Sequence, residues 1–463
     1  MLARSRQYEW SQILKVSISS STRTKHCLIL ALGCLCFASE ASAQIASNFE
    51  PVINLNTGLT SSTVPECLSF KTALNLASVN SPTVAIAQSD LDAAHADLTE
   101  AKSLRRPQVS AFTRSGFGDE GLVNTAIENQ VGLRASQRIF DFGDSRLARE
   151  AAEEEIIAQE NLILNAKARA MREAGIAYID WLDASERLEA TVERGAYFLE
   201  ELSALQSVIE TGGATISELA EISAESADAE ADRFELEFEQ QQALTRLEVA
   251  TRIQSRPCRT ANAEIKQKLN ILSDQNVPEG YLTKALNQNA ELKALDSFAR
   301  KLDIEAERQR RSRLPVLEVV GITSLTSDRR FDNFEARERI GLDASIPLLT
   351  GSSLSARSDK ARAQAQRAEN RAREQKRVLE EQITTIHRRT LLLSAQLGRR
   401  QAVIEFREME LKAAQSGYEN NIRTLPELVD VKLQLEDARL VEIRTRYNYY
   451  RQALTLKSLV GTL

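Results

Sequence analysis

The sequence predicts a mainly α-helical protein with a small β part, built from two copies of one unit. Two segments, residues 103–139 and 312–349, share one plan: a helix end, a proline, an apolar strand, a polar break and a second strand. Long helical patterns flank both segments. Because an internal repeat determines the architecture, the unit is predicted as helix, hairpin, long helix, turn and long helix, used twice.

The strands are predicted from an alternation with a period of two residues. In both copies every second residue is apolar, and the residues between are small or charged. The apolar positions are Val131, Leu133, Ala135, Ile340, Leu342, Ala344 and Ile346. Such strands suit the edge of a sandwich, and they also suit a barrel with lipid outside and water inside. Four strands are too few to close a barrel, so only an oligomer can close one.

The helices are predicted to be far longer than those of globular domains. The stretch from Ser353 to Ser416 spans roughly 95 Å at about 1.5 Å per residue, whereas a globular helix has about 8–20 residues. Apolar stripes at spacings of three and four residues indicate coiled-coil packing. Turns at 211–214 and 416–421 interrupt the two long patterns. The chain is therefore predicted to form a rod or part of a tube.

The N-terminus carries the pattern of a cleavable secretory signal over residues 1–43. A basic region precedes the apolar run 27–38, and Ala41-Ser42-Ala43 follows it. Processing as a lipoprotein at Cys34 is the alternative. Residues 44–66 are predicted to be an extended arm, 67–254 the first repeat, 255–280 an equatorial linker and 281–463 the second repeat.

Two cysteines, Cys67 and Cys258, remain after removal of the signal. An exported protein folds in an oxidising compartment, where free thiols tend to pair. Cys67 begins the first helix of one copy and Cys258 directly precedes the other copy, so internal symmetry can bring them to one level. A disulfide between them is predicted, and two separate buried thiols are the alternative.

Several function classes lack support in the sequence. The net charge is −6, and no basic patch interleaved with aromatic residues suggests a nucleic-acid partner. Outside the signal, the histidines are His95 and His387, on helical stretches without a second ligand nearby. No CxxC, phosphate-binding glycine loop or G-x-S-x-G motif occurs. Neither enzymatic activity nor a cofactor or metal is therefore expected.

Three motifs resemble the TolC family of outer-membrane channel proteins, which includes outer membrane efflux proteins and type I secretion channels. Gly417-Tyr418 leads to Arg423-Thr424 and then to two acids three residues apart. The other two motifs are the segment Ile139-Phe140-Asp141-Phe142-Gly143 and the C-terminal stretch 446–463. The motifs occur in the family's order within the duplicated plan.

The resemblance implies a homotrimer in the bacterial outer membrane. Four strands from each protomer would form a twelve-stranded β-barrel in lipid, and a coiled-coil α-barrel would continue it through the periplasm. Such a protein is an exit duct for drugs or unfolded proteins. Its partners would be a periplasmic adaptor (membrane fusion) protein and an inner-membrane ABC or proton-driven transporter. A periplasmic coiled-coil adaptor is the alternative function, since it also contains a long helical hairpin.

The resemblance also implies roles for residues near the two turns. Glu427 and Asp430 would form an acidic ring at the periplasmic entrance of the channel. Tyr418 and Arg423 would bind Glu218 and so hold the entrance closed.

A different role is open for two of these acids. The patterns Thr215-x-x-Glu218 and Thr424-x-x-Glu427 are capping boxes, in which the acid binds the backbone at the helix start. Asn421 and Ile422 stand where the family commonly has Gly and Thr. Pro426 falls in the first helical turn, where proline is tolerated because the first N–H groups lack helical partners.

Overall fold

The structure is a computed structural model that describes residues 67–119, 125–210, 215–269, 278–327, 334–420 and 422–462. The chain divides into two units, Met1–Val64 and Pro65–Leu463, and the described residues belong to the second. The predicted signal 1–43, the arm 44–66 and the first turn 211–214 lie outside the described residues. The domain boundaries stay a prediction.

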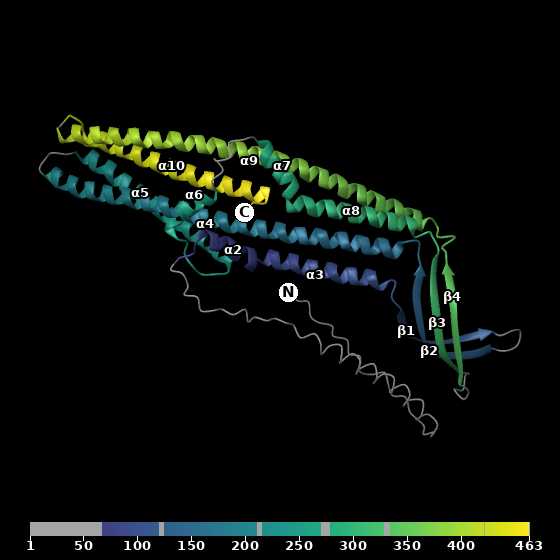
Figure 1. Cartoon of the computed structure of the whole chain (residues 1–463). Coiled ribbons are helices and arrows are strands. Elements are labelled where there is room, and N and C mark those ends of the chain that lie inside the picture. Colours follow the sequence, from purple (N-terminus) through teal and green to yellow (C-terminus); the bar gives the residue numbers. More distant parts are fainter. Residues whose placement is uncertain are drawn as a thin grey trace, which may run out of the picture. The chain divides into compact units, whose positions relative to one another are not determined.

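The elements follow one another in the same order in both halves of the unit (Figure 1). The first half contains α2 (Phe70–Asn80), α3 (Pro82–Ser103), β1 (Gln108–Asp119), β2 (Thr125–Phe140), α4 (Asp144–Glu210) and α5 (Ile216–Thr251). The second contains α7 (Pro278–Gln288), α8 (Ala290–Arg311), β3 (Val316–Ser327), β4 (Phe334–Ser345), α9 (Ser353–Glu419) and α10 (Leu425–Val460). Both α4 and α9 have 67 residues, and both α5 and α10 have 36, so corresponding helices match in length.

Some predicted boundaries differ from those in the structure. The helical stretch at the start of the first repeat is split into α2 and α3 at Ser81, whose backbone is extended (ψ 129°) because a residue before proline disfavours the helical conformation. The linker contains a 3₁₀ turn (Arg259–Ala261) and the short helix α6 (Asn262–Lys268). At the second turn α9 continues to Glu419, so the turn is shorter than predicted.

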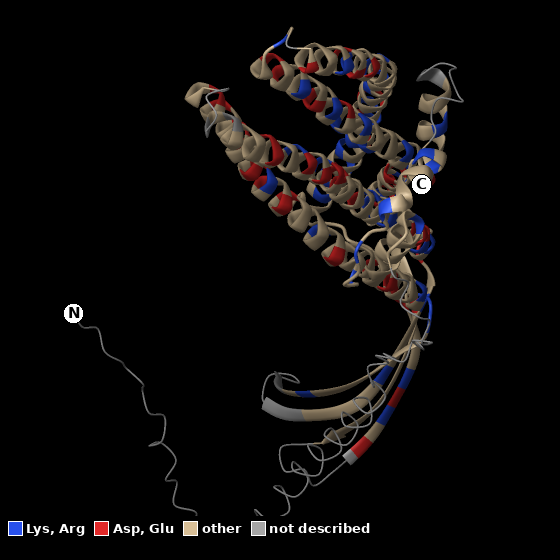
Figure 2. Cartoon of the chain, turned by 90° about the vertical axis from the view of Figure 1, so that its left-hand side faces the viewer, with Lys and Arg blue, Asp and Glu red and all other residues tan. Residues whose placement is uncertain are grey.

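The four strands form one antiparallel sheet in the order β1-β2-β3-β4. Its register places Val109 opposite Ala135, Ala135 opposite Gly321 and Gly321 opposite Ile340. Apolar or small residues therefore line up across all four strands, on what is called here the apolar face. The strands curve together away from the helices (Figure 2).

The opposite face of the sheet carries charged residues at matching positions. Arg138 lies opposite Glu318, and Glu318 lies opposite Asp343. The Arg138 Nε and Glu318 Oε1 atoms are 3.6 Å apart. Gly132 is needed where β2 meets β3 on this face, because a Cβ there would lie 2.4 Å from the carbonyl oxygen of Thr323.

The helices form a single curved layer with two free edges. On the side of the turns the helices contact one another in the order α5, α4, α10, α9; next to the sheet the order is α3, α4, α8, α9 (Figure 1). The long helices α4 and α9 run through both parts. The edges are therefore α5 and α3 on one side and α9 on the other. Among the described helices, none has a stretch long and apolar enough to cross a membrane.

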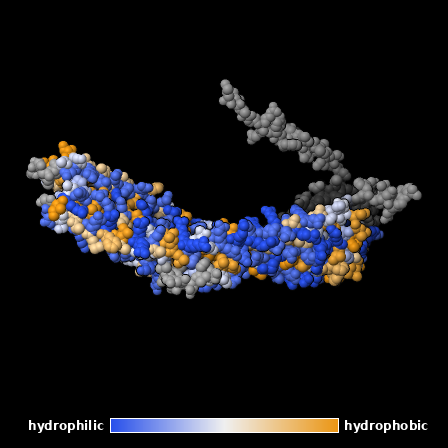
Figure 3. Space-filling model, turned by 90° about the horizontal axis from the view of Figure 1, so that it is seen from above, coloured by the Kyte–Doolittle hydropathy of each residue, from blue (hydrophilic) through white to orange (hydrophobic). Residues whose placement is uncertain are grey.

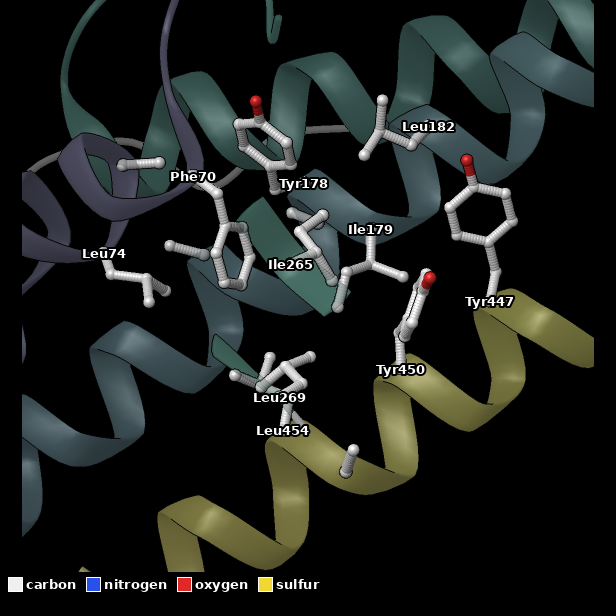
Figure 4. Packing of buried hydrophobic residues seen from close by; sticks show 14 of the residues in the cluster. Phe70, Leu74, Tyr178, Ile179, Leu182, Ile265, Leu269, Tyr447, Tyr450 and Leu454 are labelled. Carbon is white, nitrogen blue, oxygen red and sulfur yellow. The ribbon is translucent and has the colours of Figure 1, made fainter. Parts of the chain in front are cut away.

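The main hydrophobic core lies where α2, α4, α6 and α10 meet (Figure 4). Tyr178 and Ile179 of α4 are fully buried against Phe70, Ile265 and Leu454. The Tyr178 hydroxyl donates to the carbonyl oxygen of Leu68 at 2.8 Å. This polar end is thus satisfied, as buried tyrosines require.

Candidate channel entrance and gate

The turn between α9 and α10 depends on Gly417. Its carbonyl oxygen accepts the N–H groups of Ile422 at 2.8 Å and Arg423 at 3.1 Å. A Cβ at position 417 would lie 3.1 Å from the Arg423 Cγ atom. A side chain at position 417 would therefore require the Arg423 side chain to shift by a few tenths of an ångström.

Helix α10 begins with a capping box formed by Thr424 and Glu427. The Glu427 carboxylate accepts the Thr424 N–H at 2.9 Å. Pro426 stands in the first turn of this helix, as the sequence predicts. Glu427 is therefore occupied, at least in part, by helix capping.

Opposite faces of α10 have different surroundings at this end. Leu425 and Val429 are buried with Phe198 and Ile222 of the α4–α5 pair. Leu428 and Val431 are buried on the α9 side, around Ala414.

The exposed face of α10 carries the two predicted entrance acids. Both Glu427 and Asp430 are exposed. Asp430 accepts a hydrogen bond from Gln434 Nε2 at 2.7 Å, one turn further along. Residues three and four apart share one side of a helix, so this face forms an acidic strip at the start of α10.

The three predicted gate residues do not meet within one chain. Glu218 completes the capping box of α5, and its carboxylate accepts the Thr215 N–H at 2.7 Å. Tyr418 is 42% exposed. Over the described part of the chain, neither Tyr418 nor Arg423 forms a hydrogen bond or ion pair with Glu218. The lock stays a prediction for the assembled channel.

The two cysteines assigned to a disulfide are bonded in the structure. Cys67 and Cys258 have Cα atoms 4.9 Å apart and are separated by 191 residues in sequence. Next to them, Leu68 pairs with Pro257 as a short parallel bridge. The link joins the start of α2 to the segment between the two halves.

Sequence reasoning missed a group of partly buried ion pairs beside the core. Arg451 of α10 contacts Asp180 and Asp183 of α4, each at 2.6 Å. Asp183 also pairs with Arg187, which reaches Glu239 of α5. The available signal is the presence of acids at 180 and 183 within the apolar stripe of α4. These contacts join α4 to both α5 and α10.

The two histidines outside the predicted signal lie on different helices, α3 and α9. His95 is exposed on α3. His387 is 4% exposed and packs beside Tyr281, with ring centroids 5.5 Å apart. Burial lowers the pKa of His387 because it disfavours the charged imidazolium. Within the described ranges, no group of three or more His, Cys, Asp or Glu side chains could hold a metal ion.

Comparisons with known proteins agree with this arrangement. A family model described as outer membrane efflux protein matches residues 73–251. Among solved structures, the CusC channel has a TM-score of 0.74 at 17% identity, covering 86% of this chain and 93% of its own. The chain has the fold of TolC-like outer-membrane channels. The predicted resemblance, and the mainly helical fold class with four strands, are thereby confirmed.

Two further channels show the same likeness. The CmeC channel of Campylobacter jejuni has a TM-score of 0.74 at 16% identity, covering 85% of both chains. VceC of Vibrio cholerae has a TM-score of 0.70 at 17% identity, covering 85% of this chain and 96% of its own. No curated protein matches the chain. The family match agrees with the predicted location in the outer membrane, extending into the periplasm.

Proposed function

We propose that the protein is a trimeric exit duct in the outer membrane, gated at the α9–α10 turn. It would receive cargo from an inner-membrane transporter and a periplasmic adaptor. The observation that carries this proposal is the set of open edges on a curved sheet and on a curved helical layer. The open edges of the sheet and of the helical layer each need a partner chain of matching shape to cover them.

The sheet supports closure by further copies of the chain. Strands β1 and β4 are edge strands, and their outer backbone groups need partners if the sheet lies in lipid. The exposed apolar face fits that position: Val131 is 61% exposed, and Ile340 is 86% exposed. Figure 3 shows apolar side chains gathered at the end that carries the strands. Head-to-tail pairing of β4 with β1 of the next copy would close a ring.

The helical layer supports the same closure. Its edge helices carry large exposed apolar residues: Phe234 and Phe238 on α5 and Phe406 and Met409 on α9 are each at least 55% exposed. Exposed apolar residues gathered along a helix are typical of surfaces that another chain covers. Contact between α9 of one copy and α5 of the next would cover them. With three copies, twelve strands and twelve long helical segments would form the two barrels.

Fractionation and gel migration test this assembly. The protein should co-purify with outer membranes, and an unboiled extract should migrate as a cross-linkable trimer that becomes a monomer on boiling. A periplasmic adaptor would not stay with the outer membrane. A soluble periplasmic monomer would contradict the proposal.

Asp430 is expected to give the entrance its cation preference. Three copies of the acidic strip on α10 around one axis would attract cations and repel anions in a narrow opening. Replacing both Glu427 and Asp430 with Ala should reduce cation over anion permeability in planar bilayers. Because Glu427 also caps α10, Asp430→Asn is the cleaner single variant, and it should reduce the preference without affecting the cap.

A matched variant controls for the loss of charge alone. Glu230 is an exposed acid about four turns along α5, where it pairs with Arg233 at 3.7 Å, and Glu230→Gln removes the same charge. This variant should keep the parent's selectivity. Equal selectivity in Asp430→Asn and the parent channel would rule out the acidic ring.

Tyr418 and Arg423 are expected to hold the entrance closed, through the acid Glu218 across the assembled tip. Each polar contact at a partly wet site contributes only about 1 kcal/mol, so three copies give a few kcal/mol that a docking partner can overcome. The variant Tyr418→Phe with Arg423→Ser should raise single-channel conductance at unchanged trimer yield. The single variant Tyr418→Phe is the control for loss of one hydroxyl. A parent-like conductance in the double variant would exclude these residues as the lock.

The transporter partner would decide between small-molecule efflux and type I protein secretion. The family description supports efflux. Identifying the adaptor and transporter that co-purify with the cross-linked trimer distinguishes the two cargo classes. An ABC transporter with a secreted protein substrate would favour secretion, and a proton-driven pump would favour efflux.

A further inference from the structure

The apolar face of the sheet extends past the strands towards the helices. A β-bulge lies between Arg138 and Phe140 at the end of β2. It places Phe140 opposite Leu317, which lies opposite Ala344 on the apolar face. The bulge therefore adds an aromatic ring to the border of this face that adjoins the helices.

A second aromatic ring joins Phe140 at this border. Phe142 lies 4.7 Å from Phe140 between ring centroids, in an edge-to-face arrangement. The rings remain half exposed, at 50% for Phe140 and 40% for Phe142. Arg311 of α8 holds the loop in place by donating from Nη1 to the Phe142 carbonyl oxygen at 3.2 Å. The pair is thus fixed, and it is open to whatever surrounds the sheet.

Basic residues gather at the same level, where each helix passes into a strand. Arg105 and Arg106 precede Pro107 in the first half, and Arg313 precedes Pro315 in the second. All three arginines are exposed. The carbonyl oxygen of Arg105 accepts a hydrogen bond from Gln137, which lies on the apolar face of β2. This contact places the turn that carries Arg105 and Arg106 beside the border of the apolar face that adjoins the helices.

We propose that four of these residues, Arg106, Arg313, Phe140 and Phe142, form a boundary belt that binds anionic phospholipid headgroups. Arg105 is paired with the buried Asp141 at 3.5 Å and is left out of the belt. The inference rests on the proposed function, because only a sheet in the outer membrane places the belt at its periplasmic surface. Aromatic side chains border the apolar band of outer-membrane barrels, where phenylalanine rings lie on the hydrocarbon side, and arginines beside them attract anionic lipid phosphates. The belt would fix the depth of the duct in the membrane.

Reconstitution with defined lipids tests the belt. The mature protein is incorporated into nanodiscs of phosphatidylcholine with increasing phosphatidylglycerol, and retained phosphatidylglycerol is counted by native mass spectrometry. The parent should retain phosphatidylglycerol preferentially, and less of it at high salt. The variant Arg106→Gln with Arg313→Gln should weaken this retention by roughly tenfold, since each basic residue near an anionic membrane surface strengthens lipid binding severalfold.

Arg399→Gln with Arg400→Gln is the matched control. These residues are exposed on α9, and the variant removes the same charge away from the sheet. It should retain phosphatidylglycerol like the parent. Equal retention by the parent, the Arg106/Arg313 variant and the control would overturn the belt while the channel itself still inserts and conducts. Failure of the parent to insert and conduct at all would instead overturn the proposed function.

The depth of the aromatic pair gives an independent measurement. Phe140→Trp adds a fluorophore at the border, and Gln401→Trp adds one at an exposed position of α9 distant from the sheet. Phosphatidylglycerol brominated near the headgroup should quench the added emission of Phe140→Trp and leave that of Gln401→Trp unchanged. Quenching of neither variant in a conducting trimer would contradict the placement of the belt.

Discussion

Replacing Arg451 with methionine is expected to lower the free energy of unfolding by about 2–3 kcal/mol, because hydrogen-bonded contacts to two charged groups are lost. Arg451 donates to Asp180 and Asp183, whose side chains are 19% and 6% exposed. Methionine fills similar space but removes one of the two cations that each carboxylate contacts, since Arg246 still pairs with Asp180 and Arg187 with Asp183. Arg246 is half exposed and Arg187 is largely buried, so the larger loss should concern Asp180. Thermal or denaturant unfolding of the detergent-solubilised trimer measures the change.

Two further variants separate charge loss from lost packing. Arg399→Met removes an exposed cation from α9 and should change stability by only a few tenths of a kcal/mol. Combining Arg451→Met with Asp180→Asn and Asp183→Asn should recover part of the loss, because both carboxylates become neutral while Arg187 keeps Glu239 as its partner and Arg246 is half exposed. A single Arg451→Met variant as stable as the parent would show that these ion pairs do not stabilise the α4–α10 contact.

Removing the disulfide is expected to cost about 5 kcal/mol on the chain-entropy model, because the bond closes a loop of 191 residues. The variant Cys67→Ala with Cys258→Ala frees the start of α2 from the segment that follows α5. The short bridge between Leu68 and Pro257 should then open more easily. The measurement is the melting temperature of the oxidised parent against that of the variant.

Two controls accompany this comparison. Reductant should lower the parent's melting temperature towards that of the variant and leave the variant unchanged. Thiol labelling of the unreduced, denatured mature protein should be negative. Two reactive thiols per chain, or equal melting temperatures for parent and variant, would contradict a stabilising disulfide.

Much of the fold follows from periodic patterns that one sequence contains. The period of two in Val131–Ala135 and Ile340–Ala344 identifies strands, and both stretches fall inside β2 and β4. The stripes of α4 and α9 identify long helices, and Thr424-x-x-Glu427 identifies the start of α10. Such local signals work because side-chain direction repeats regularly within each type of element.

Contacts between distant segments could not be read from the sequence. The register that aligns Val109, Ala135, Gly321 and Ile340 depends on how four strands pair. Asp180 and Asp183 interrupt the apolar stripe of α4, but the sequence does not show that Arg451 of α10 lies beside them. The bulge that turns Phe140 onto the apolar face likewise depends on its pairing with β3.

The sequence by itself determined the element types, the duplicated order and the capping boxes, because each depends on residues only a few positions apart. Tertiary structure alone decided which edges stay open and where Glu218 lies relative to Tyr418 and Arg423. It showed that Glu218 is engaged in capping α5 within one chain. The physical reason is that packing energy comes from contacts between surfaces far apart in sequence. A local periodic pattern does not specify which of these surfaces come into contact.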